Sequence, residues 1–273
     1  PRGLSDTDGM ETLKGYIDAV REIRPKSFLF ENVHGFIYKP HLHSLAYLES
    51  ETKKLGYRLT WQVLNAADFG APQIRQRFIM VGVLDSLPQF RFPKHSHYNP
   101  NRQSRYKYNK ENSQIKLFDD ELGLELEPWV TAGQAINHLD YDILEDVDNL
   151  AGSKHKDLLP LIPPGDNYLY LTKKRGYSDP KFEWRSRYWS FLLKLSPDLP
   201  SWTIQASFSN NMGPFHWKNR FLRIQEIVRL QTFPDSFILP GTFRDKWRLI
   251  GNAVPPLLAE KIACKIRDVV RWR

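Results

Sequence analysis

Cysteine is nearly absent from the 273-residue sequence, which contains only Cys264. One cysteine cannot form an intramolecular disulfide or a multi-cysteine metal site, so neither is expected, and no other metal site is predicted. The sequence also lacks any run of about 18 or more apolar residues, so no segment is expected to span a membrane. No signal peptide is visible. These absences predict an intracellular, cytoplasmic protein, associated with the nucleoid if it is bacterial.

Acidic residues are also fewer than basic residues. The sequence has 39 Lys and Arg residues against 31 Asp and Glu residues, which leaves a net charge of +8. This balance favours a polyanionic partner, with nucleic acid first, although many basic proteins bind none. Hydrophobic residues make up 41% of the chain and aromatic residues 13%, which suits a globular protein of one large or two modest domains.

The first part of the chain alternates between helical and strand patterns. Apolar residues recur at helical spacing over residues 8–24 and 41–55. Strands are predicted at three short apolar or alternating runs, residues 28–30, 57–63 and 78–83. Helices that alternate with strands in this way predict an α/β sheet layered with helices. A further helix is predicted at residues 224–230, another short one within 129–139, and a last one after Pro255.

Polar residues follow the first predicted strand directly. Phe28–Phe30 is typical of a strand buried on both faces, and Glu31 and Asn32 come next. A carboxylate at a buried strand end must be ionised and paired, or neutral with a raised pKa. The neutral form could donate a proton or a hydrogen bond to a ligand. The alternative is that Glu31 merely caps the next turn or pairs with a nearby arginine.

Two arginines precede the strand predicted at 78–83. Arg75 and Arg77 are two positions apart, so both side chains point the same way if the extended conformation begins there. Arginines at the mouth of a strand could bind an anion or hydrogen-bond to a base carbonyl. The alternative is a pair of ordinary surface arginines.

A glycine and an asparagine precede the last predicted helix. Asn252, beside Gly251, could hydrogen-bond to a ligand at the helix start, or merely cap that helix. The segment alone does not separate these two roles.

Basic and aromatic residues alternate in two central segments. Residues 94–114 read either as a solvated loop or as a nucleic-acid contact segment. Residues 158–200 are rich in Pro, Gly, Trp and Tyr and lack long periodic patterns, which predicts a small irregular domain that presents cations to phosphates and base edges. An ordinary insertion with a basic surface is the alternative. The predicted DNA-binding residues are Lys173, Lys174, Arg175, Arg185 and Arg187.

Four short motifs stand in a defined order along the chain. They are Glu-Asn-Val at 31–33, Gln-x-Arg-x-Arg at 73–77, Arg-Leu-Gln-x-Phe-Pro-Asp at 229–235 and Gly-Asn-Ala-Val-Pro at 251–255. This order resembles the DNA cytosine-5 methyltransferase family over residues 1–85 and 200–273. The segment between them lies where that family keeps its target-recognition domain.

The resemblance implies an enzyme that flips a cytosine out of double-stranded DNA. A cysteine would attack carbon 6, and S-adenosyl-L-methionine would give its methyl group to carbon 5, in a restriction-modification context. By similarity, Glu31 would contact N3 and the exocyclic amine, Asn32 would hold the backbone of the site, and Arg77 would reach O2. Arg75 would support the catalytic loop or the same pocket. The residues beside the cofactor would be Asn252, Ala253 and Val254.

The sequence departs from the family at two motifs. The Phe-x-Gly-x-Gly cofactor signature and the Pro-Cys-Gln nucleophile segment are both absent, and Cys264 is expected to be a structural thiol in the last helix. We therefore expect a partial doubly wound (Rossmann-like) S-adenosylmethionine-dependent methyltransferase domain with a smaller irregular target-recognition domain. Residues 1–129 would belong to the catalytic α/β domain, 130–249 to the target-recognition domain and 250–273 to a returning helix. An N-terminal segment or subunit would supply the remainder.

Two other functions stay open from the sequence. The chain could be a non-catalytic, sequence-specific DNA-binding module that uses residues 173–187. It could also be an inactive truncated methyltransferase, whose incomplete sheet would expose an edge and favour association or poor solubility.

Overall fold

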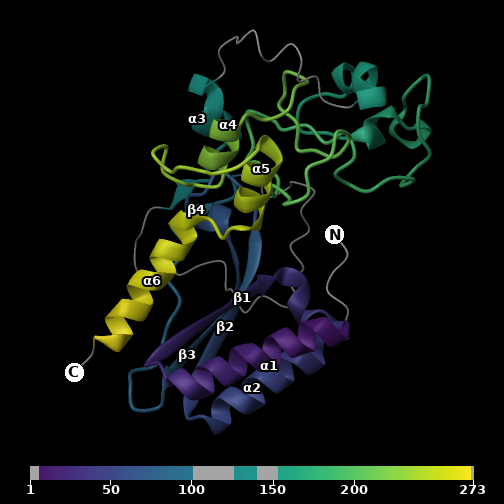
Figure 1. Cartoon of the computed structure of the whole chain (residues 1–273). Coiled ribbons are helices and arrows are strands. Elements are labelled where there is room, and N and C mark those ends of the chain that lie inside the picture. The colour runs from purple at the N-terminus through teal and green to yellow at the C-terminus, as the bar shows by residue number, and fades with distance from the viewer. Residues whose placement is uncertain (1–5, 101–125, 140–152, 272–273) are drawn as a thin grey trace.

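The central sheet is formed by strands β1 (Ser27–Val33), β2 (Tyr57–Asn65) and β3 (Gln76–Leu84). The computed structural model describes residues 6–100, 126–139 and 153–271. The strand order is β1-β3-β2, and β3 is antiparallel to both of its neighbours. The strands β1 and β2 therefore run parallel to each other, with the last strand of the three inserted between them (Figure 1).

Helices cover both faces of this sheet. Because alternate side chains of a strand point to opposite faces, Phe78 and Met80 of β3 pack against α1 (Asp6–Ile23) and α2 (Leu42–Lys54). On the other face, Ile79 and Val81 pack against α6 (Pro256–Val270), the helix drawn in yellow in Figure 1. The layered α/β arrangement predicted from the sequence is confirmed.

The strand that is buried on both faces is β3, not β1. All residues of β3 from Arg77 to Val83 are buried. In β1, by contrast, Leu29 is 39% exposed and Val33 is 56% exposed, so the prediction of a doubly buried first strand is wrong. The reason is position, because β1 pairs only with β3 among the described strands, and the cluster that packs against α6 contains residues of β2 and β3 but none of β1.

A second region, at the top of Figure 1, is built on two hydrophobic clusters. The first cluster joins α3 (Ala132–Ile136), α4 (Ile224–Leu230) and α5 (Phe243–Asn252). The second includes Leu159, Tyr168, Phe191 and Phe215. Between residues 153 and 223 the structure consists of 3-10 helices, turns and isolated bridges, which agrees with the irregular region predicted from the sequence. The two-residue strands β4 (His97–Tyr98) and β5 (Glu127–Pro128) pair before this region begins.

Helix α5 was missed by the sequence patterns, and Asn252 is its last residue. The prediction that Asn252 begins or caps the last helix is therefore wrong, since α6 begins at Pro256 with Pro255 as its N-cap. Consecutive prolines explain the break, because a residue that precedes proline disfavours the helical conformation. A signal for α5 was present in the reciprocal capping of Thr242 and Asp245. No helix in the described part of the chain is both long and apolar enough to cross a bilayer.

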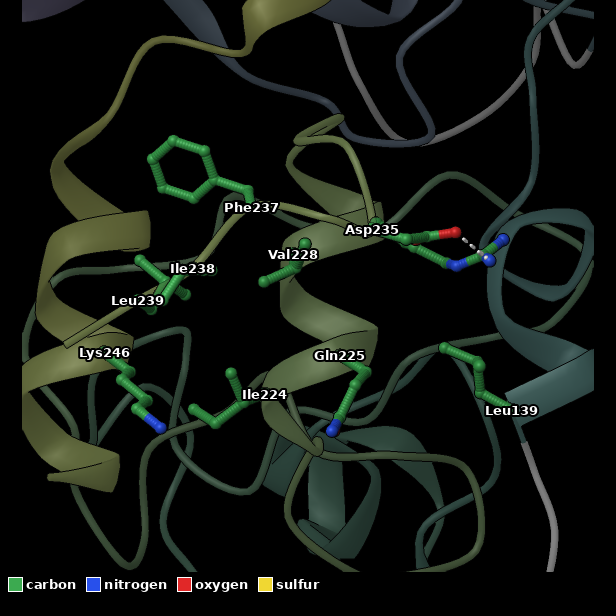
Figure 2. Close-up of a pocket in the computed structure, with 10 residues that line it drawn as sticks. Leu139, Ile224, Gln225, Val228, Asp235, Phe237, Ile238, Leu239 and Lys246 are labelled. Carbon is green, nitrogen blue, oxygen red and sulfur yellow. Dashed lines mark hydrogen bonds and ion pairs between the residues drawn. The ribbon is translucent and has the colours of Figure 1, made fainter. Parts of the chain in front are cut away.

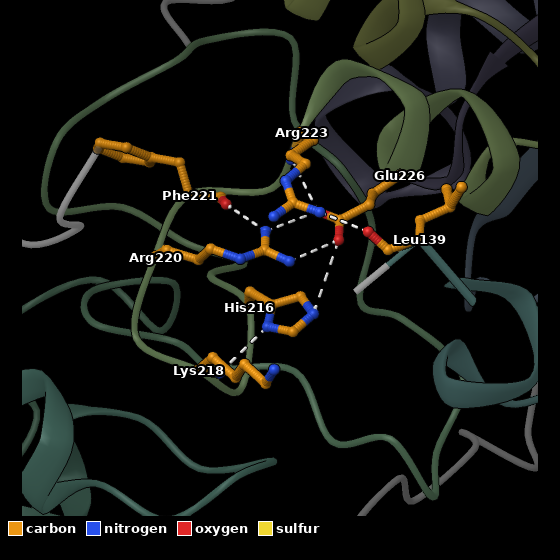
Figure 3. A network of polar contacts seen from close by, with 7 residues as sticks. All are labelled: Leu139, His216, Lys218, Arg220, Phe221, Arg223 and Glu226. Atoms are coloured by element: carbon orange, nitrogen blue, oxygen red, sulfur yellow. Dashed lines mark hydrogen bonds and ion pairs between the residues drawn. The ribbon is translucent and has the colours of Figure 1, made fainter. Parts of the chain in front are cut away.

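A buried ion-pair network fixes the residues that lead into α4 (Figure 3). The fully buried carboxylate of Glu226 accepts hydrogen bonds from both terminal nitrogens of Arg220, at 2.9 and 2.7 Å. It also accepts the amide of Arg223 at 2.7 Å. His216 lies against the same carboxylate, with Nε2 at 3.7 Å. Removing one partner of a buried ion pair is costly, so this network is expected to stabilise the contact between residues 216–223 and α4.

Candidate active site

Glu31 and Arg77 form an ion pair across two neighbouring strands. Glu31 lies within β1 rather than after it, and it is opposite Ile79, whereas Arg77 is opposite Val33. The two side chains are therefore diagonal neighbours on one face of the sheet. The Nε atom of Arg77 lies 2.8 Å from Oε1 of Glu31.

The Glu31 side chain combines both properties predicted for it. It pairs with an arginine, and burial raises its pKa despite the opposing charges of Arg77 and Arg75. Burial also lowers the pKa of Arg77, which the Glu31 carboxylate opposes. The side chain of Glu31 remains 29% exposed and that of Arg77 10% exposed. The pair is thus shielded from bulk water but remains open to a ligand on one side.

Residues adjacent to Glu31 shape the edge of the sheet. Leu29 and Val33 lie on the same face of β1 as Glu31, since residues two apart share a face. Both are exposed, so the carboxyl group has an apolar residue on each side. Asn32 accepts a hydrogen bond from the amide of Val33 at 2.8 Å. This contact is local to the end of β1, and the role of Asn32 in the site stays a prediction.

Arg75 has a different environment from Arg77. Its fully buried guanidinium donates hydrogen bonds to the carbonyls of Ile204, at 2.9 Å, and Gly251, at 2.6 Å. A longer bond, of 3.4 Å, reaches Gln73 Oε1. Arg75 is therefore not an ordinary surface arginine, because backbone carbonyls occupy its guanidinium. Its geometry is that of a brace between three segments.

A buried polar network connects three of the motif segments. The side-chain amide of Gln73 donates to Gln231 Oε1 at 2.7 Å and to the Leu230 carbonyl at 3.2 Å. Gln231 in turn donates to the carbonyl of Ala253 at 2.5 Å. These carbonyls lie at the ends of α4 and α5, where backbone acceptors lack partners within the helix. The order of motifs along the sequence thus corresponds to one cluster in space.

Gly251 permits a close approach of α5 to the segment beside it. A Cβ atom at this position would lie 2.6 Å from Ala206 Cα and 2.7 Å from the carbonyl carbon of Gln205. Both of these are backbone atoms, so relief would require movement of the main chain.

Gly251→Ala is therefore expected to lower the free energy of unfolding by about 1–3 kcal/mol, since overpacking a tight contact has this cost. Urea unfolding of the two proteins measures the difference. Gly15→Ala in α1 is the matched control, because a Cβ atom there would meet no atom within 4 Å and alanine favours helix. Equal losses for both substitutions would contradict the role of Gly251.

The predicted cofactor residues follow α5 directly. The side chain of Asn252 is exposed, and Val254 packs against the cluster around α6. Ala253 uses its carbonyl to bind Gln231. The segment thus offers one exposed amide group and one apolar side chain, which fits a wall of a site for a small amphipathic molecule.

A hollow of about 440 Å³ lies elsewhere (Figure 2). It is formed between α4 and α5 by Ile224, Val228, Lys246 and the loop that carries Phe237–Leu239. None of the predicted site residues lines it. The Glu31–Arg77 pair instead lies beside β1, which is an edge strand among the described strands.

The predicted DNA-binding residues divide into exposed and paired groups. Lys173 and Lys174 are exposed and line a surface hollow of about 420 Å³, with Lys174 Nζ 4.5 Å from the centre of the Trp184 ring. Arg185 and Arg187 are also exposed. Arg175, in contrast, is paired with Asp166 at 2.5 Å. Residues 101–114 of the other basic segment lie outside the described residues.

Asp68 is a partly buried acid that the sequence patterns did not single out. It lies in the turn after β2 and accepts a hydrogen bond from Trp129 Nε1 at 2.9 Å. Burial raises its pKa to about 7. The contact ties this turn to the first residues of the second region. An aspartate in a polar turn carries no sequence signal of burial, which is why it was missed.

Asp68→Asn should stabilise the protein increasingly as the pH rises. In the unfolded chain the Asp68 pKa is about 4, so between pH 4 and pH 7 the folded state holds a proton that the unfolded state has released. The free energy of unfolding therefore falls through this window. Asparagine keeps the acceptor for Trp129 without this loss, and its advantage should grow by about 2–3 kcal/mol between pH 5 and pH 8. Urea unfolding at both pH values tests this, with exposed Asp198→Asn as the control; a pH-independent difference would contradict it.

Structural relatives define the class of protein first. An Escherichia coli prophage protein assigned as a DNA modification methyltransferase has a TM-score of 0.62 and 19% identity, over 98% of this chain and 76% of that one. A methyltransferase of Entamoeba histolytica has a TM-score of 0.54 and 16% identity, over 98% of this chain and 75% of that one. The fold is that of the Rossmann-like, S-adenosylmethionine-dependent methyltransferases, as predicted.

Sequence relatives define the family. Residues 2–268 match the family described as C-5 cytosine-specific DNA methylase, and the chain belongs to this family. It is 36% identical to the type II methyltransferase M.SacI of Streptomyces achromogenes, over 92% of this chain and 62% of that protein. It is 30% identical to M.NgoFVII of Neisseria gonorrhoeae, over 94% of this chain and again 62% of that protein. The chain thus spans about three fifths of the length of these curated relatives, and the predicted resemblance is confirmed.

Proposed function

We propose that the chain is a component of a DNA cytosine-5 methyltransferase of a restriction-modification system. The observation that carries the proposal is the Glu31–Arg77 pair, with its raised carboxyl pKa and its open side, inside motifs of the matched family. The substrate would be a cytosine flipped out of double-stranded DNA. The type II methyltransferases among its relatives support the biological context.

The roles follow from the chemistry of each group. Glu31, with its raised pKa, would share a proton with cytosine N3 and accept a hydrogen bond from the exocyclic amine. Arg77 would donate to O2 of the same ring, so the base would bridge the two side chains. Asn32 would hold the strand end beside them, and Arg75 would position β3 through its carbonyl contacts.

The methyl donor would be S-adenosyl-L-methionine, which supplies an electrophilic methyl group to carbon 5 when bound. Asn252, Ala253 and Val254 would form one wall of its site, with the exposed amide of Asn252 as the polar contact. The fold class and the family support this assignment.

The nucleophilic cysteine would come from an N-terminal segment or subunit. Cys264 is unsuited, because it lies two residues after Ile262, which faces the sheet, and is therefore turned about 200° away around the helix axis. The same segment would pair with β1 along the edge that no other described strand occupies, and it would cover Leu29 and Val33. An apolar strand edge of this kind is a ready template for another strand.

Reconstitution tests the proposal. The chain is mixed with an N-terminal segment that carries the Phe-x-Gly-x-Gly and Pro-Cys-Gln motifs, with tritiated methyl donor and duplex DNA. The expected result is transfer of label to carbon 5 of cytosine. A stable complex that binds DNA and transfers no label would instead indicate a non-catalytic DNA-binding module.

A further inference from the structure

The loop Trp184–Trp189, called here the 184–189 loop, exposes an unusual combination of side chains. Tyr188 is 82% exposed, and Trp189 is also among the exposed large residues. Arg185 and Arg187 are exposed beside them. Isolated exposed aromatic residues are common, but two in sequence beside cations form a surface suited to nucleobases and phosphates.

Hydrogen bonds from buried side chains hold the backbone of this loop in place. The hydroxyl of buried Tyr168 donates to the Arg187 carbonyl at 2.7 Å and accepts the Arg187 amide at 3.1 Å. Buried Asn167 donates to the carbonyl of Trp189 at 2.7 Å. Both residues that flank Tyr188 are therefore fixed, while its ring stays in solvent. A rigid, exposed aromatic side chain loses little conformational entropy on binding.

Contacts connect the loop to the candidate active site. The ring of Trp189 packs edge-on against Trp202, with centroids 5.5 Å apart. On either side of Trp202, the Ser201 amide donates to the Pro72 carbonyl at 2.8 Å and the Thr203 hydroxyl donates to the Ile74 carbonyl at 2.7 Å. The segment reached in this way leads directly into Arg75 and Arg77. The 184–189 loop is thus anchored, through Trp202, next to the segment that immediately precedes Arg75 and Arg77.

We propose that Tyr188 is a specificity-determining residue that contacts the bases of the DNA duplex, while Lys173 and Lys174 contact its phosphates. This inference rests on the proposed function for its substrate. Tyr188 can stack on a base or hydrogen-bond to a base edge through its hydroxyl. The two lysines are flexible point charges beside Trp184, which suits contacts that do not depend on sequence.

Selection from a duplex library with a randomised core separates these roles. The complete methyltransferase, with its N-terminal part, is used for wild type, Tyr188→Ala and Lys173→Ala/Lys174→Ala. Tyr188→Ala should reduce discrimination at one or two adjacent base pairs by about tenfold, with unselected duplex bound within about twofold of wild type. The lysine double variant should weaken binding to all sequences alike and lower the salt dependence by about two phosphate contacts.

Matched controls keep the outcomes distinct. Tyr38→Ala, an exposed tyrosine that precedes α2, should leave sequence preference unchanged. Melting curves should be equal for wild type and Tyr188→Ala, because the ring is exposed. An unchanged sequence preference in Tyr188→Ala would overturn this inference and leave the proposed function intact. If Tyr188→Ala loses discrimination but the wild-type protein transfers no methyl group, the proposed function alone is overturned. A wild-type protein that binds no duplex would overturn both the proposed function and this inference.

Discussion

Glu31→Gln is expected to reduce methyl transfer by the complete enzyme by about 10²- to 10⁴-fold, the range for loss of a positioned acid–base group. The amide keeps the shape of the carboxyl group but cannot share a proton with cytosine N3, and it leaves Arg77 without its counter-charge. The measurement is single-turnover transfer of tritiated methyl groups to duplex DNA. Because burial raises the Glu31 pKa, a step that needs its proton should also slow as the pH rises through that pKa.

Glu22→Gln is the control for Glu31, since Glu22 lies exposed on α1, and its activity should equal that of wild type. Both variants should melt as wild type does, which shows that the change is in chemistry. Retention of activity within about threefold by Glu31→Gln would remove Glu31 from the reaction, given the expected range.

Arg75→Ala is expected to lower the free energy of unfolding by about 3–5 kcal/mol, the combined cost of buried acceptors left without a donor and of a cavity in the interior. The substitution leaves the carbonyls of Ile204 and Gly251 buried without their donor, and it opens a cavity where a fully buried guanidinium was. Equilibrium unfolding in urea measures this change in the free energy of unfolding. The free energy of unfolding of Arg75→Lys should lie between those of wild type and Arg75→Ala, because one ammonium group lacks the planar fork that reaches both carbonyls.

Arg248→Ala provides the comparison for Arg75. Its side chain is 65% exposed and pairs only with Asp245 at 3.2 Å among the described residues, so a change within about 0.5 kcal/mol is expected. If Arg75→Ala were as mild as this control, the three segments around Arg75 would not depend on its hydrogen bonds.

Local sequence patterns predicted which segments form strands and helices better than they predicted which of these elements lie side by side. The apolar run at 78–83 and the helical spacing of α1, α2 and α6 correctly predicted β3 and the helices around it. The burial of β1 could not be predicted, since a three-residue apolar run looks the same at the centre and at the edge of a sheet. The position of β3 between β1 and β2 is a long-range pairing that no local pattern carries.

The contact between the motif segments could be anticipated from the sequence, but the geometry of the candidate site could not. The order of motifs correctly indicated that residues 73–77, 229–235 and 251–255 belong together. That Arg75 braces carbonyls while Arg77 pairs with Glu31 depends on where β3 begins, one residue after Arg75. Asp68 could not be singled out from local patterns because its hydrogen-bond donor, Trp129, follows it by 61 positions.

The two hydrophobic clusters of the second region also determine where the protein could be recombined with a relative. The cluster around Tyr168 and Phe191 is separate from the one that joins α3, α4 and α5, so a cassette could be exchanged there without cutting through the helical cluster. The segment Ser201–Gln205 would have to stay with the acceptor protein, because Arg75 and Gln73 bind its backbone. An exchange that replaced these residues would put at risk the hydrogen bonds that Arg75 and Gln73 make to this segment. Specificity could then be transplanted with the 184–189 loop while the catalytic scaffold remained whole.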